Sequence, residues 1–472
     1  MVRNVGFARL LGDISLGEWA LTLSFLEVAT PLALLGLTGG FGRFVEVYRR
    51  QGTLGDYLLH ALGVSTIGVA AVLAWMLVFP QSFERLIYNH SGTPTVAGHC
   101  ALAFVAIIVF TVTAELMTGL RHMRVLSAMY FLQSTLFTGI GLSALLLTSD
   151  WRWVVLAFAS ASVLACTPGL FVLLQHHRQE LLPTGRLSSG SLWTRILPFA
   201  AALWVSNILS GLYETSDRYM LLHLTGQSAD EGQAAVGQYH CGRILPNLMI
   251  SLAVMLSGIL LPYLSHDWEN GLQHRTGRRM RHVLISCCMM LLAASAAAHG
   301  ISPFLFRWAF EGRYPTAEAV LPLALAQAAW HGLFVVCQAS LLCAERGRLL
   351  ALITAGGLLC NLICNFSFIP RWGVAGAVAA TALSASVALT LTLLTMRRLG
   401  WGCGRGAAIC CCLAPLSIVG GLFSTVAMVA VMLFLAGRTN WLLDAHDRKE
   451  VDDALLPQLT RWGLRINSLW PQ

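Results

Sequence analysis

The chain has 472 residues, of which 56% are apolar and 11% are charged, whereas about a quarter of the residues of a soluble domain are charged. The formal net charge is +8, but the arginines are dispersed among short connections instead of forming one stripe, which argues against a nucleic-acid-binding protein. No connection between apolar segments is long enough to hold a soluble catalytic domain. The chain is therefore predicted to act within or across a lipid bilayer.

Twelve apolar segments follow one another along the chain. A hydrocarbon core about 30 Å thick needs roughly 20 residues at about 1.5 Å of helix each, so every segment can span or nearly span a bilayer. The segments are 16–37, 56–79, 98–118, 125–147, 153–175, 196–222, 236–263, 282–300, 318–342, 350–369, 374–395 and 407–436. This pattern predicts an all-α, polytopic membrane protein.

The two ends of the chain are less regular. Residues 1–12 look like the last third of an earlier helix, so we expect the first helix to be truncated. The segment 407–436 is either one crossing or, as we favour, a tight pair of short helices broken at Gly420-Gly421, which would return the basic tail to the cytoplasm. Apolar residues recur at helical spacing over 451–470, which is typical of a helix that lies along the membrane surface.

Arginine is concentrated in alternate connections. If the connection 38–55 is cytoplasmic, the cytoplasmic connections contain seventeen arginines and the outer ones five, and the positive-inside rule then sets the orientation. The sequence His176-His177-Arg178 falls in a cytoplasmic connection, where we expect it to be solvated.

An internal repeat relates the two halves of the chain. Gly17-x-Trp19 recurs as Gly237-x-Tyr239, Arg124 as Arg348, and the tetrapeptide 160–163 as 384–387, at offsets of 220 and 224. The repeat predicts two six-helix lobes, 1–180 and 190–398, in the same orientation and related by a pseudo-two-fold axis. An extra helix or tight helix pair over 405–438 and a tail over 439–472 follow. Such lobes commonly enclose an alternately accessible cavity, which indicates a transporter.

Charged side chains inside a bilayer are expensive, so each one is a candidate functional residue. Glu27 lies near the centre of its segment and is a candidate proton or cation site; the alternative is a carboxylate paired with an arginine. Glu214, Asp217 and Arg218 lie three or four residues apart, and this spacing predicts an ion pair within one helix. His331 is more typical of a hydrogen bond between helices than of a proton relay. We take Glu27, Asp217 and His331 as candidates for ion coupling.

Several kinds of chemistry have no motif in the sequence. There is no P-loop and no HExxH motif, and the spacing of the cysteines and histidines does not suggest a metal site. We therefore predict that the chain is not an enzyme and has neither a metal nor a cofactor.

Short motifs along most of the chain resemble one family of membrane proteins. They are Ala8-Arg9-Leu10-Leu11-Gly12, Gly17 with Leu35-Gly36-Leu37 and Arg43, Ser216-Asp217-Arg218-Tyr219-Met220 with Leu224-Thr225-Gly226, Val236-Gly237-Gln238-Tyr239 through Pro246, and 369–377. They are similar to polysaccharide exporters and lipid-linked oligosaccharide flippases of the multidrug/oligosaccharidyl-lipid/polysaccharide superfamily. The resemblance implies two six-helix lobes, often with two extra helices, and the flipping of lipid-linked sugars.

A lipid-linked sugar carries a diphosphate, which an arginine can bind in a forked geometry. Arg243 enters a helix beside Tyr239 and is the first candidate for contact with the substrate. The further candidates for this contact are Arg218, Asp217, Glu27 and Tyr239. Arg9 and Arg43 are the matching candidates in the first half, although Arg43 is more typical of a loop anchor.

The predicted function is the flipping or export of lipid-linked oligosaccharide or polysaccharide by alternating access. Cation-coupled multidrug export by the same fold is one alternative, and an integral-membrane glycosyl- or acyltransferase is another. The expected location is the inner (plasma) membrane. The expected partners are the lipid-linked sugar, membrane lipid and the enzymes of polysaccharide synthesis, with no nucleic acid among them.

Overall fold

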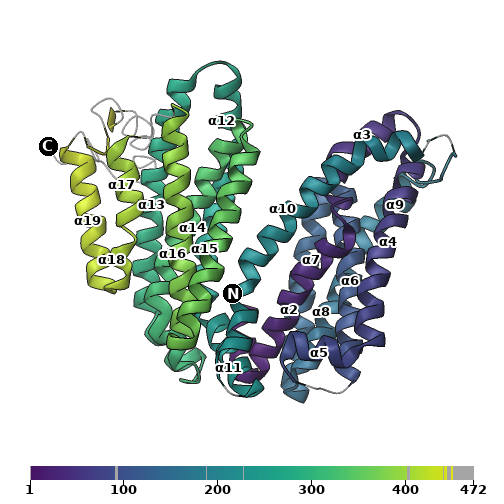
Figure 1. Ribbon diagram of the computed structural model, residues 1–472, viewed down its shortest axis with the longest axis horizontal. Coiled ribbons are helices and arrows are strands. Elements are labelled where there is room, and N and C mark those ends of the chain that lie inside the picture. The colour runs from purple at the N-terminus through teal and green to yellow at the C-terminus, as the bar shows by residue number, and fades with distance from the viewer. Residues whose placement is uncertain are drawn as a thin grey trace, which may run out of the picture. The chain divides into compact units, whose positions relative to one another are not determined.

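The computed structural model describes residues 2–90, 94–185, 187, 189–226, 228–400, 404–439, 441–443 and 448–449, and every regular element in this part of the chain is a helix (Figure 1). The chain divides into two compact units, Met1–Cys241 and Gly242–Gln472.

The helices of the first unit alternate between long apolar spans and short connecting helices. They are α1 (Val2–Leu11), α2 (Asp13–Leu34), η1 (Thr38–Gly40), α3 (Phe41–Arg50), α4 (Leu54–Val78), α5 (Pro80–Tyr88), α6 (Pro94–Gly119), α7 (Met123–Thr148), α8 (Trp151–Ala165), α9 (Thr167–His176), α10 (Ser189–Leu224) and, up to its last residue, α11 (Ala229–Gly242).

The second unit also combines long apolar spans with short helices, and one of its spans is more buried than the others. Its elements are α12 (Ile244–Glu269), α13 (Gln273–Phe304), η2 (Leu305–Ala309), α14 (Pro315–Cys343), α15 (Gly347–Trp372), α16 (Val374–Arg398), α17 (Arg405–Leu413), α18 (Leu416–Val419) and α19 (Leu422–Arg438). The buried helix is α14, which packs against α12, α13 and α16.

The predicted polytopic membrane protein is confirmed. Within the described residues, ten helices are long and apolar enough to cross a bilayer, and an eleventh span results if α2 and the bent segment Thr38–Arg50 are counted together. These two meet at 70°. The backbone turns through Leu35 and Gly36, both at positive φ, and a Cβ at Gly36 would collide with the Ala200 carbonyl of α10. Glycine is therefore required at this bend.

The two irregular ends have distinct structures. Residues 2–11 form a helix of their own, α1, which is separated from α2 by Gly12 at φ 78° and packs through Phe7 onto α7. The segment 407–436 is a pair of short helices, as favoured, with the break at Gly420 and Gly421. Both α17 and α19 contact α13, so the chain reverses at α18 (Figure 1). The surface helix predicted over 451–470 lies outside the described residues.

The first compact unit extends beyond the predicted lobe. It continues to Cys241, whereas the boundary was predicted between residues 180 and 190. The reason is that α10 packs along α2, where the Trp204 indole donates to the Leu32 carbonyl at 3.1 Å. The division of the chain into two repeated six-helix lobes remains a prediction.

A close crossing of α2 and α11 connects the two glycines of the repeat. A Cβ on Gly17 would collide with the Gln233 carbonyl, and a Cβ on Gly237 would collide with the Asp13 carbonyl. Since Gln233 is 220 residues from Asp13 and Gly237 is 220 residues from Gly17, the two contacts are equivalent under the offset of the repeat. Reciprocal contacts of this kind define a local two-fold axis at the crossing.

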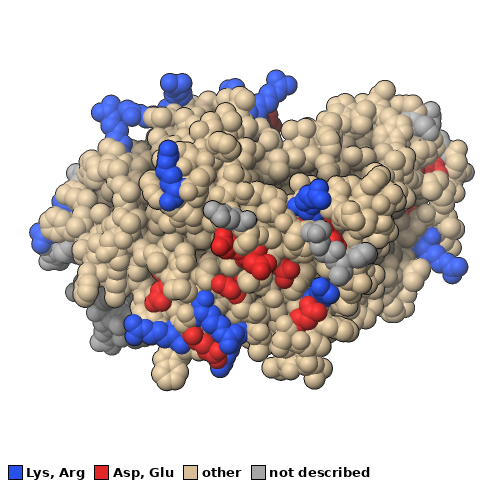
Figure 2. All heavy atoms as spheres, turned by 60° about the horizontal axis from the view of Figure 1, so that its bottom comes forward, with Lys and Arg blue, Asp and Glu red and all other residues tan. Residues whose placement is uncertain are grey.

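Acidic residues begin both helices of this crossing. Asp13 lies in the first turn of α2, and Asp230 and Glu231 lie in the first turn of α11, where the helix dipole favours negative charge. The end of the first unit at which α5 and α11 lie (Figure 1) comes forward in Figure 2, which shows acidic side chains there. The positive-inside count predicts that this face is the outer one.

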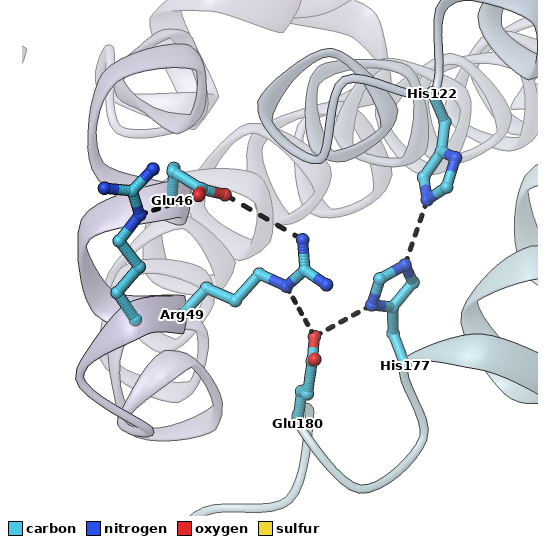
Figure 3. Close-up of polar contacts among 6 residues, drawn as sticks. Glu46, Arg49, His122, His177 and Glu180 are labelled. Carbon is cyan, nitrogen blue, oxygen red and sulfur yellow. Dashed lines mark hydrogen bonds and ion pairs between the residues drawn. The ribbon is translucent and has the colours of Figure 1, made fainter.

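At the other end of the first unit, a polar network holds the connection that follows α9 (Figure 3). The Glu180 carboxylate accepts from Arg49 Nε at 3.0 Å and bonds His177 Nδ1 at 2.8 Å, and His177 Nε2 lies 3.0 Å from His122 Nε2. His177 is only 4% exposed, so the prediction that it is solvated was wrong. The basic pattern 176–178 could not reveal that a loop from another helix pair would cover it.

A second set of hydrogen bonds, made by Asp56, holds the same connection a few residues further along the chain. Both carboxylate oxygens of buried Asp56 accept hydrogen bonds from the Thr184 amide and hydroxyl and from the Gly185 and Leu187 amides, at 2.7–3.3 Å. The segment that leads into α10 is therefore tied to α3 and α4.

We predict that Gly17→Ala and Gly237→Ala each lower the melting temperature of the detergent-solubilised protein, by similar amounts. Overpacking of this kind costs about 1–3 kcal/mol. Gly139→Ala is the matched control, because Gly139 also lies inside a helix but has open space where its Cβ would be. A Gly17→Ala protein as stable as the Gly139→Ala protein would contradict the close crossing.

We also predict that acidification loosens the connection 177–187. The pKa of His122 is below its usual 6.5, because burial disfavours the charged ring and His177 adds repulsion. Burial alone would raise the pKa of Glu180, but hydrogen bonds from His177 and Arg49 outweigh it and lower that pKa below 4.5. Both shifts stabilise the network at neutral pH, and the stabilisation is lost as the pH falls, first through His122 below 6.5 and then through Glu180.

Amide hydrogen exchange of 177–187 at pH 7.5 and 5.5, corrected for intrinsic rates, measures this loosening. A bond between two imidazoles requires that at least one ring be neutral, so His122→Gln should reduce the pH dependence. His176→Gln, which changes an exposed neighbouring ring, should retain it. Equal protection of wild-type 177–187 at both pH values would exclude the network as a pH-sensitive tie.

Candidate functional site

Four of the predicted site residues lie together where α2, α10 and α11 pack. They are Glu27 of α2, Asp217 and Arg218 of α10, and Tyr239 of α11. We call these four residues, together with Ser24, the charged cluster. Glu27 lies about 21 Å along α2 from Asp13, at about 1.5 Å per residue, so the cluster lies within the depth of a bilayer about 30 Å thick.

Arg218 joins α10 to α2. Its Nη1 donates to Ser24 Oγ at 2.6 Å and lies 3.6 Å from Glu27 Oε2. Ser24 donates its own hydroxyl proton to the Ala20 carbonyl at 2.8 Å, so its oxygen is available to accept from the arginine. The two charged side chains differ in accessibility: that of Arg218 is 10% exposed, whereas that of Glu27 is 42% exposed.

Asp217 joins α10 to α11. Tyr239 donates its hydroxyl to Asp217 Oδ2 at 2.5 Å, and both residues are buried, at 0% and 1% exposure. A buried carboxylate is costly unless it accepts hydrogen bonds. This contact therefore fixes α11 against α10.

Adjacent positions on α10 serve two different neighbours because successive residues of a helix point about 100° apart. Asp217 consequently faces α11 while Arg218 faces α2. The predicted ion pair of Arg218 with Glu214 was wrong, since the arginine pairs across helices with Glu27. Helical spacing alone could not show that α2 supplies a carboxylate at this level.

The arrangement suits an exchange of partners at Arg218. One guanidinium nitrogen is held by a neutral hydroxyl and by a carboxylate at 3.6 Å, which is beyond hydrogen-bond length. Protonation of Glu27 would remove the charge of the carboxylate that pairs with Arg218, and an arginine inside a membrane favours an anionic partner.

The other predicted residues lie elsewhere. Arg9 is exposed on α1. Arg43 of α3 lies over the Phe199 ring of α10 at 4.9 Å, a cation–π contact. Arg243 lies in the break between α11 and α12, and His331 lies in α14; both belong to the second unit.

Sequence reasoning missed Ser24, the fifth member of the charged cluster. Ser24 has no sequence signal beyond its place three residues before Glu27 on the same helix face. A second set was also missed: Tyr88 bonds Thr22 of α2 at 2.7 Å and Cys100 at 3.2 Å, and its carbonyl accepts from Gln233 of α11 at 2.9 Å. Polar residues spaced along the apolar α2, at 22, 24 and 27, were the available signal.

A metal site needs several His, Cys, Asp or Glu side chains close together within the described part of the chain. In this part of the chain no three His, Cys, Asp or Glu side chains lie close enough together to hold a metal ion.

Comparison with known proteins gives the family. A family model described as "Polysaccharide biosynthesis protein" matches residues 1–268, which is more than half of the chain. The chain belongs to this polysaccharide biosynthesis family, and the resemblance seen in the sequence is confirmed.

One curated relative and two solved structures extend this result. The uncharacterized membrane protein YabM of Bacillus subtilis (strain 168) is 22% identical over 416 residues, which are 85% of this chain and 77% of YabM. The lipid II flippase MurJ, in an inward closed conformation, has a TM-score of 0.69 at 11% identity and covers 93% of this chain and 97% of its own. A multidrug resistance MATE family transporter in an inward-facing conformation has a TM-score of 0.68 at 13% identity and covers 84% and 94%. At these identities the two structures establish the fold alone.

We predict that Tyr239→Phe destabilises the protein by about 1.5–3 kcal/mol, because it removes the hydrogen bond to a buried carboxylate. Tyr219→Phe is the matched control, since the Tyr219 hydroxyl reaches the Leu21 carbonyl at only 3.5 Å. Thermal unfolding in detergent measures both. A loss for Tyr239→Phe no larger than that for Tyr219→Phe would show that the contact does not hold α11 in place.

Proposed function

We propose that the chain flips a lipid-linked oligosaccharide or polysaccharide unit across the membrane by alternating access, with no catalytic step of its own. Three findings support this proposal. The family is that of polysaccharide biosynthesis proteins, the fold is that of the lipid II flippase MurJ, and Arg218 lies 3.6 Å from the carboxylate of Glu27.

The observation that carries the proposal is the asymmetry of the Arg218–Glu27 pair. Glu27 is accessible and Arg218 is nearly buried, so protons or cations can reach the carboxylate while the arginine is held in place by Ser24. The diphosphate of a lipid-linked sugar is an anion that an arginine can bind in a forked geometry. Arg218 therefore exchanges Glu27 for the substrate phosphate when Glu27 is neutralised.

The membrane potential can supply the energy for outward transport. Because the cytoplasm is negative, each negative charge of the diphosphate that moves outward across 100 mV gains about 2.3 kcal/mol. When Glu27 loses its proton or cation at the outer side, the restored Arg218–Glu27 pair competes with the phosphate and promotes its release.

The remaining candidates have supporting roles in this proposal. Arg243 and His331 remain candidates within the second unit, and Asp217 with Tyr239 keeps α10 and α11 in register. Arg9 and Arg43 are contacts for the headgroup in the first half of the chain. The location that suits this function is the inner membrane, next to the enzymes of polysaccharide synthesis.

Cation-coupled drug export is the second candidate function. The observation that favours it is Glu27 itself, a half-exposed carboxylate at mid-span in a fold shared with a MATE family transporter. The buried arginine beside it disfavours a cationic drug at this place, because like charges repel in a medium of low dielectric constant.

The test is complementation of a strain that lacks its polysaccharide exporter. We expect Arg218→Lys and Glu27→Gln each to lower surface polysaccharide by at least tenfold, because lysine cannot replace the forked guanidinium and glutamine cannot be protonated. Arg371→Lys and Glu311→Gln are the controls, since both side chains are exposed and bonded within their own segments.

Three outcomes separate the possibilities. Full polysaccharide export by Glu27→Gln would remove the proposed coupling. Full export by Arg218→Lys would remove the forked phosphate contact. If the wild-type chain restores drug resistance but not polysaccharide export, the second candidate function replaces the first.

A further inference from the structure

A groove opens between α16 and α17 in the second unit, apart from the charged cluster. It has a volume of about 620 Å³. Its walls are mostly apolar side chains, among them Leu393 and Leu394 of α16 and Ile409 and Leu413 of α17. α17 packs onto α13 and also contacts α14 and α16.

Two arginines border the same groove. Arg397 lies in the last turn of α16 and Arg405 is the first residue of α17, and both are exposed. No acidic side chain is among the described residues that line the groove. The groove therefore combines a cationic end with an apolar wall.

The length of the apolar wall corresponds to half a bilayer. From Arg397 to Thr390 the groove follows α16 for about 10 Å, and from Arg405 to Leu413 it follows α17 for about 12 Å, at about 1.5 Å per residue. One leaflet contributes about 15 Å of a hydrocarbon core about 30 Å thick. An acyl chain that starts at the arginines and follows the groove would remain within one leaflet.

We propose that this groove binds an anionic glycerophospholipid of the cytoplasmic leaflet. The phosphate lies between Arg397 and Arg405, and an acyl chain lies against the leucines and the isoleucine. The positive-inside count assigns both arginines to the cytoplasmic side, where basic pockets between spanning helices are suited to anionic headgroups. The proposal does not depend on the transported substrate.

The chain supplies a matched control for the two arginines. Arg398 is the next residue of α16, is equally exposed and carries the same charge, but it does not line the groove. A general attraction of the basic surface for anionic lipid would involve all three arginines alike, whereas a built site involves only two of them.

The experiment uses the purified full-length protein in detergent and native mass spectrometry. Phosphatidylglycerol and phosphatidylcholine with identical acyl chains are added at equal concentration, and the lipid-bound fraction is measured for each. We expect the wild-type protein to retain phosphatidylglycerol preferentially. The double variant Arg397→Gln/Arg405→Gln should lose this preference by roughly tenfold or more, because two phosphate contacts are removed. Arg398→Gln should retain it within about twofold.

A second variant tests the apolar wall without changing charge. Ala408 lines the groove on α17, and Ala408→Trp fills it while both arginines remain. This variant should also lose phosphatidylglycerol, and it keeps the test valid if the double arginine variant does not fold.

Two results would overturn the proposal. An equal loss of phosphatidylglycerol in Arg398→Gln would indicate general surface attraction. Displacement of the lipid by soluble glycerophosphoglycerol at equal concentration would indicate a site for free anions, to which the apolar wall contributes nothing.

Discussion

The crossing of α2 and α11 is the constraint on which the first unit depends. The two backbones approach until no side chain fits between them, and this is achieved by placing Gly17 opposite Gln233 and Gly237 opposite Asp13. The crossing sets the rotation of both helices, so that Ser24 and Glu27 of α2 face α10 and Tyr239 of α11 reaches Asp217. The hydrogen bonds and the ion pair of the charged cluster therefore depend on that crossing.

Within the charged cluster, the contact between Asp217 and Tyr239 differs from the contacts of Arg218 in how far the partners are buried. Asp217 and Tyr239 are both buried. Arg218 bonds the neutral Ser24 and lies near Glu27, whose side chain is 42% exposed. A single helix, α10, thus carries a contact to α11 and a contact to α2 at adjacent positions.

Most of the fold could be predicted from the sequence, because a membrane span is a local property of about 20 residues. The break at Gly420-Gly421 was predicted correctly, since glycine pairs mark places where a helix can end. The partners of charged residues were harder to predict from the sequence. Arg218 was assigned to Glu214 of its own helix and His177 to solvent, but their partners Glu27 and Glu180 are supplied by folding. Helical periodicity tells which residues share a face and not what that face meets.

The sequence by itself determined the spans, the offset of about 220 residues between repeated motifs, the family and the set of costly charges. Only the tertiary structure decided that the repeated glycines contact one another, that α10 and α11 belong with the first unit, and that Arg218 bonds a serine 194 residues away. Hydropathy and spacing are read along the chain, whereas contacts between helices depend on how their surfaces pack, which no local pattern records.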